Sequence, residues 1–204
     1  MLSRRKLFAA GALLALATSV GLPVQAATVD DPQAFIQNLG NKAMKVLGNT
    51  ALSQDQRGHE VRQLLTVNFD LDRIGALALG RFGKQATEAE WREYRALFQD
   101  YIVMIYSTRI GDRSWNSFTV LGSRQSSDGD TIVASETTTK GEAPNRIDWR
   151  VHSVGGSLRI IDVAIAGISM VVTQREEFGS VIQRSDGGIA QLLQRLRQRT
   201  AQNK

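Results

Sequence analysis

Apolar residues recur at helical spacing in two parts of the chain, which indicates helices that each bury one face. Four of the segments precede residue 112, and two lie near the end of the chain. Residues suited to capping a helix mark several starts: Asp31 precedes Pro32, Asp70 opens a short segment, and Thr87 has capping-box spacing to Glu90. The predicted helices cover residues 31–47, 53–67, 71–79, 87–110, 169–184 and 188–199.

Short segments rich in β-branched residues, separated by turn residues, lie between the two helical parts. The Gly155-Gly156 pair fits a tight hairpin turn. In the third segment apolar residues from Ile147 to Val151 alternate with charged ones, so one face of the strand should be buried. The predicted strands cover residues 117–124, 131–140, 146–154 and 157–165. Together these patterns predict an α+β fold, an antiparallel sheet of about four strands flanked by N-terminal and C-terminal helices.

The longest predicted helix, residues 87–110, carries a broader and more aromatic stripe than a helix that only packs on a core needs. The stripe runs through Trp91, Tyr94, Leu97, Phe98, Tyr101, Ile102, Ile105 and Tyr106.

Residues 1–26 have the three-part layout of an export signal. Basic residues from Arg4 to Lys6 precede an apolar stretch, and small residues around Ala26 suit a signal peptidase. The stretch from Ser3 to Phe8 resembles the twin-arginine pattern, and an ordinary Sec signal is the alternative. Either route delivers the protein to the periplasm.

The remaining 178 residues, 27–204, suit a single domain. The signal holds three of the 25 basic residues and none of the 20 acidic ones, so 22 basic and 20 acidic residues remain. This near balance gives no reason to expect a nucleic-acid partner. The absence of cysteine excludes disulfides, thiolate catalysis and a lipoprotein anchor.

The histidine and aspartate residues that could belong to a metal site or a catalytic site have simpler structural interpretations. His59 and His152 lie on polar faces of their predicted elements. Asp70 and Asp72 suit a helix cap followed by a first-turn acid. The Asp128-Gly129-Asp130 segment suits a hairpin turn, because no series of calcium ligands follows it. No metal site or cofactor is therefore expected.

A pocket enzyme is the alternative to a binding protein. Asp148, His152 and Asp162 are its candidate acid–base residues, although strand alternation places Asp148 and His152 opposite the apolar face. Motifs for nucleotide binding and serine hydrolysis are missing from the sequence. We therefore expect a protein that is not an enzyme.

Two separated motifs resemble the toluene-tolerance family, the periplasmic phospholipid-binding proteins of Mla-type transport. The first runs from Phe69 to Ile74 and on through Leu79-Gly80-Arg81-Phe82 to the aromatic helix. The second runs from Ile161 to Val171, followed by Arg175 and Phe178. Gly83 departs from the family pattern, in which an aromatic residue is common at that place.

The resemblance implies a monomeric carrier whose apolar cavity, between sheet and helices, holds the tails of a phospholipid. A hopanoid is the alternative ligand. The implied partners are an inner-membrane ABC transporter complex with an MCE-domain subunit and an outer-membrane lipoprotein complex, and no cofactor is implied. An adaptor that binds these complexes without carrying lipid is a further alternative.

Lipid contacts are expected from the aromatic helix and from the apolar faces of the strands. The expected lipid-binding residues are Leu97, Phe98, Tyr101, Ile102, Ile105, Tyr106, Phe118, Val120, Ile147, Trp149, Val151, Val163, Ile165 and Ile168. Each of them suits a filled core equally well.

Overall fold

A computed structural model describes residues 31–111, 116–139, 143–184 and 187–201. The expected export signal, residues 1–26, lies outside the described residues.

Six α-helices confirm the predicted helical segments, with ends that differ by one or two residues. They are α1 (Pro32–Leu47), α2 (Gln54–Asn68), α3 (Leu71–Leu79), α4 (Glu88–Gly111), α5 (Met170–Gln183) and α6 (Gly188–Ala201). A short 3₁₀ helix, η1 (Gly80–Lys84), was not predicted. Among the described residues, none of the helices combines the length and apolar character that crossing a membrane requires.

The helix starts are fixed by side chains that accept hydrogen bonds from the first turn. The Asp31 carboxylate accepts from the Gln33 amide at 2.9 Å, and the Asp70 carboxylate accepts from the Arg73 amide at 2.9 Å. Ser53 and Gln56 form a complete capping box at the start of α2. Local sequence therefore determines where these helices begin.

The sheet is antiparallel throughout, with the strands in chain order. Its strands are β1 (Ser117–Gln125), β2 (Thr131–Thr138), β3 (Asn145–Val154), β4 (Ser157–Ile165) and β5 (Ile168–Ser169). The fold class is confirmed, with one strand more than predicted. The fifth strand forms because the chain reverses at Ala166 and Gly167, which have φ angles of 48° and 82°.

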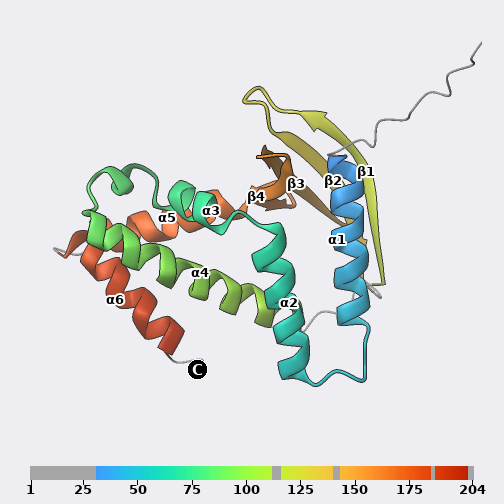
Figure 1. Ribbon diagram of the computed structural model, residues 1–204, viewed down its shortest axis with the longest axis horizontal. Helices are drawn as coiled ribbons and strands as arrows, with labels where there is room; N and C mark the ends of the chain where they lie inside the picture. The colour runs from blue at the N-terminus through green and yellow to red at the C-terminus, as the bar shows by residue number, and fades with distance from the viewer. Residues whose placement is uncertain (1–30, 112–115, 140–142, 185–186, 202–204) are drawn as a thin grey trace, which may run out of the picture.

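Buried side chains form two hydrophobic clusters instead of one. The helical cluster is built from α2 to α6. Near its centre the Tyr94 hydroxyl donates to the Gly75 carbonyl at 2.9 Å, and burial raises the pKa of this hydroxyl. The sheet cluster joins α1 to the inner face of the sheet. Figure 1 shows α1 lying along the strands, and the helices from α3 to α6 gathered in a separate layer.

The two clusters meet where α2 passes into α3. Phe69 packs against both clusters, and the Asp70 amide donates to the Ile160 carbonyl of β4 at 2.9 Å. The helical layer is thus attached to the sheet through the backbone of β4.

Close packing of α1 on the sheet depends on Gly40. A methyl group added at Gly40 would lie 2.1 Å from a ring carbon of Phe118, so Gly40→Ala should destabilise the fold by about 1 to 3 kcal/mol. Gly58→Ala in α2 is the matched control, because nothing lies within 4 Å of the added group. The control should stabilise the protein by about 0.5 to 1 kcal/mol. Urea denaturation measures both changes, and a Gly40→Ala protein as stable as the control would contradict this packing.

Candidate functional site

An apolar pocket of about 180 Å³ lies between the helical layer and the sheet. Its wall is formed by the five α-helices from α1 to α5 and by the strands β1, β3 and β4. The lining residues are Leu39, Gly40, Ala43, Val61, Leu64, Leu65, Phe69, Leu71, Ile74, Phe98, Ile102, Tyr106, Phe118, Ile147, Trp149, Asp162, Val163, Ile165, Met170, Val171 and Gln174.

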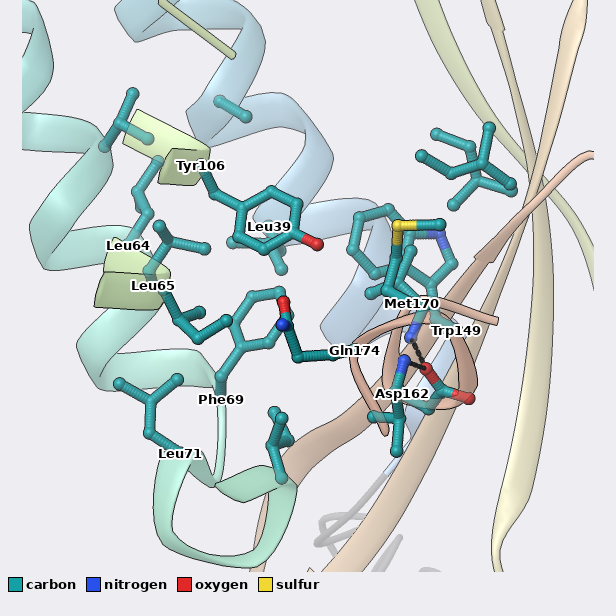
Figure 2. Close-up of a pocket in the computed structure, with 18 of the residues that line it drawn as sticks. Leu39, Leu64, Leu65, Phe69, Leu71, Tyr106, Trp149, Asp162, Met170 and Gln174 are labelled. Atoms are coloured by element: carbon teal, nitrogen blue, oxygen red, sulfur yellow. Dashed lines mark hydrogen bonds between the residues drawn. The ribbon is translucent and has the colours of Figure 1, made fainter. Parts of the chain in front are cut away.

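Element geometry explains why these residues converge. On α4 the lining residues Phe98, Ile102 and Tyr106 are spaced four apart, so they form one face of the helix. On the sheet, Trp149 of β3 lies opposite Val163 of β4, and paired residues of neighbouring strands point to the same side. Figure 2 shows Tyr106 and Trp149 lining the pocket from opposite sides.

The pocket reaches the protein surface beside the β4–β5 hairpin. Ile165 lines the pocket and is nevertheless 42% exposed, and Ile168, its partner in β5, is 61% exposed. Because Ile165 belongs to both surfaces, the apolar wall of the pocket continues to solvent there.

The structure brings eight of the fourteen expected lipid-binding residues into the pocket wall. They are Phe98, Ile102, Tyr106, Phe118, Ile147, Trp149, Val163 and Ile165.

The other six lie outside the pocket wall. Leu97, Tyr101 and Ile105 are on other faces of α4 and pack into the helical cluster, where the Tyr101 and Phe178 ring centroids are 6.2 Å apart. Val120 and Val151 belong to the sheet cluster. Ile168 is on the exposed hairpin. The broad stripe of α4 therefore serves two purposes, because one part faces the pocket and the rest packs on neighbouring helices.

Sequence reasoning missed the contributions of α1, α2, α3 and α5 to the pocket. The missed residues are Leu39, Gly40, Ala43, Val61, Leu64, Leu65, Phe69, Leu71, Ile74, Asp162, Met170, Val171 and Gln174. Most of them belong to ordinary helical stripes, which indicate a buried face but not whether the facing space is filled. The short run of small residues in α1, Gly40 and Ala43, was the available signal for close approach.

Two polar groups in the wall are fully engaged by the protein itself. The Trp149 indole N–H donates to the Ser135 hydroxyl at 2.8 Å. The Asp162 carboxylate accepts from the Val163 amide at 2.8 Å, from the Val171 amide at 3.1 Å and from the Ser169 hydroxyl at 2.5 Å. Asp162 thereby joins β4 to the first turn of α5, where a negative charge is favourable.

The three candidate acid–base residues have separate hydrogen-bond partners. Asp148 forms an ion pair with Arg146 at 3.0 Å. His152 Nδ1 lies 2.5 Å from the buried Asp130 carboxylate, and its Nε2 lies 3.0 Å from Arg73. Asp162 binds the start of α5, as described above. Each of the three therefore contacts its own structural partners, which is not the arrangement of a shared acid–base site.

The remaining polar candidates also have structural partners. Asp70 caps α3, and Asp72 accepts a hydrogen bond from Gln99 at 3.0 Å. Asp130 follows the turn and pairs with Arg150 at 2.6 Å. Within the described residues, His, Asp and Glu form no group of three or more that could hold a metal ion.

An α+β fold with an apolar pocket between helices and sheet is typical of small binding proteins, and a solved structure shares the fold. That structure is the phospholipid-binding protein from Ralstonia solanacearum in complex with a phospholipid. It matches with a TM-score of 0.71 and 26% sequence identity, over 85% of this chain and 98% of that chain. The chain belongs to the MlaC protein family, whose model matches residues 37–198. The family suggested by the two sequence motifs is thereby confirmed.

Replacing Asp162 tests whether its role is structural. Asp162→Ala should lower the free energy of unfolding by about 2 to 3 kcal/mol, because two backbone amides and a hydroxyl lose a charged acceptor. Asp148→Ala, which removes a surface ion pair, should cost less than about 1 kcal/mol. Chemical denaturation of both variants measures the difference, and equal stability of the two would contradict the assignment.

Proposed function

We propose that this protein is a periplasmic phospholipid carrier of an Mla-type intermembrane transport system, and that the pocket between helices and sheet holds the lipid tails. The observation that carries the proposal is the pocket itself, with a wall almost entirely of aliphatic and aromatic side chains. Membership of the MlaC family and similarity to a protein solved with phospholipid support the choice of ligand.

The energetics of lipid transfer explain why an apolar pocket is sufficient. A two-tailed lipid has on the order of 30 methylenes, and each costs about 0.8 kcal/mol in water, so desorption faces roughly 24 kcal/mol. A barrier of this size corresponds to a wait on the order of a day. A carrier removes much of the barrier by providing a second apolar environment, and this role needs no reactive group.

The pocket must enlarge to hold complete tails. A cavity of about 150 Å³ accommodates a molecule of the size of benzene, and the present pocket is only slightly larger at about 180 Å³. The pocket wall is divided between two hydrophobic clusters, so the lining can separate there without exposing the centre of either cluster.

The proposal extends to location and partners. The expected signal at residues 1–26 would direct the protein to the periplasm, where it would work as a monomer without a cofactor. It would exchange lipid with an inner-membrane ABC transporter complex that has an MCE-domain subunit and with an outer-membrane lipoprotein complex.

Lipid extraction tests the proposal directly. Protein purified from its native compartment without denaturant should release phospholipid in near-stoichiometric amount into an organic extract, measured by mass spectrometry. Hopanoid in place of phospholipid would support the alternative ligand. An extract free of both, from folded protein, would contradict the carrier.

Filling the pocket separates a carrier from an adaptor. Ala43→Trp places an indole in the pocket wall, and lipid content per protein should fall by about tenfold, the effect of about 1.4 kcal/mol. The matched control is Ala34→Trp, on an exposed position of the same helix, which should retain wild-type lipid content. Thermal denaturation verifies that both variants fold. Intermembrane transfer that persists in a lipid-free Ala43→Trp protein would favour the adaptor.

A further inference from the structure

One side chain in the pocket wall has unused hydrogen-bonding capacity. The wall includes four polar side chains, those of Tyr106, Trp149, Asp162 and Gln174. Trp149 and Asp162 are engaged by Ser135 and by the start of α5, as described above. Gln174 lies on α5 one turn after Met170, so both side chains face the pocket.

The Gln174 carboxamide is only partly occupied. Its Nε2 donates one hydrogen bond to the Glu177 carboxylate at 3.2 Å. The second amide hydrogen and the Oε1 atom have no hydrogen-bond partner within the described residues. Figure 2 shows the carboxamide directed into the pocket, toward Phe69 and Tyr106. These unused donor and acceptor positions are therefore available to a polar group of a ligand that enters the pocket.

The ligand chemistry that matches this position is an ester carbonyl. Glycerophospholipids carry ester carbonyls where the tails join the glycerol, directly below the headgroup. When tails enter an apolar pocket, these carbonyls lose water and need a hydrogen-bond donor. Gln174 is half-buried in the pocket wall, and this intermediate depth suits the junction between tails and headgroup.

We propose that Gln174 donates its free amide hydrogen to an ester carbonyl of the bound lipid, and that it thereby selects ester-linked glycerophospholipids. This inference rests on the proposed function. Ether-linked lipids and hopanoid hydrocarbons, which lack that carbonyl, would leave the Gln174 amide buried without a partner. Gln174 is therefore a specificity-determining residue and not a source of most of the affinity, which the apolar wall provides.

Matched lipids test the proposal. Short-chain phosphatidylcholines that dissolve as monomers are used in diester and diether forms, with the same headgroup and chain length. Each competes with a phospholipid that carries a fluorescent acyl chain. Wild-type protein should bind the diester about fivefold more tightly, the usual effect of one hydrogen bond. Gln174→Leu should weaken diester binding by about the same factor and should not weaken diether binding.

Controls distinguish recognition from damage to the fold. Gln183→Leu replaces an exposed glutamine of the same helix, outside the pocket wall, and should keep the diester preference. Gln174→Met, nearly the same size as glutamine, should lose the preference as Gln174→Leu does, and thermal denaturation verifies folding of each variant.

Two outcomes overturn the inference: equal wild-type affinity for the two lipids, or a diester preference that survives in both Gln174 variants. Absence of binding of either lipid to wild-type protein would instead contradict the proposed function, so the two failures are distinguishable.

Discussion

Hydrogen bonds from β4 to the starts of α3 and α5 hold the two layers of this protein together. The Ile160 carbonyl accepts from the Asp70 amide, and the Asp162 carboxylate accepts from the Ser169 hydroxyl and the Val171 amide. Both attachments lie within three residues of one strand. The helical layer is therefore attached to the sheet close to β4, and the space beside this attachment is bounded mainly by apolar side chains. The pocket is a consequence of this arrangement.

An apolar cavity lowers the stability of the protein that contains it. A fully enclosed cavity costs about 24 cal/mol per Å³, so about 4 kcal/mol is the upper bound for the pocket of about 180 Å³, which reaches solvent at Ile165. Domains of ordinary stability have a free energy of unfolding of about 5 to 15 kcal/mol, so a cost near this bound is a large fraction of the total. Larger side chains at small positions such as Ala43 would fill the space. A ligand that occupies the pocket of the folded state restores the lost contacts and shifts folding in its favour.

Local signals in the sequence were sufficient to predict most helices and strands, but they missed more than half of the residues in the pocket wall. Asp70 indicates a helix start because its side chain can accept from the first turn, and Gly155-Gly156 indicates a hairpin because glycine tolerates the positive φ angles observed there. The strand β5 was missed because two residues are too few to show the alternation of apolar and polar side chains that marks a strand. The pocket residues of α1 and α2 were missed because periodicity reports the direction of a side chain, whereas a cavity depends on the distance between elements. Packing also accounts for Gly83, at a position where an aromatic residue is common in the family. The Trp91 ring occupies the space beside Gly83, and one of its carbons would lie 2.6 Å from an added methyl group.

The hydrogen-bond partners of the charged residues around the pocket favour a binding role over a catalytic one. A general acid or base must have a proton-transfer position free to meet its substrate. Here the Asp162 carboxylate is in the pocket wall, but its oxygens accept three hydrogen bonds that hold α5 in place, and rotating it toward a substrate would break them. His152 and Asp148 are held by Asp130 and Arg146. The Gln174 carboxamide, which does not titrate near neutral pH, has spare hydrogen-bonding capacity in the wall. A wall of this kind can recognise a neutral polar group and hold apolar chains, and both properties are those of a carrier.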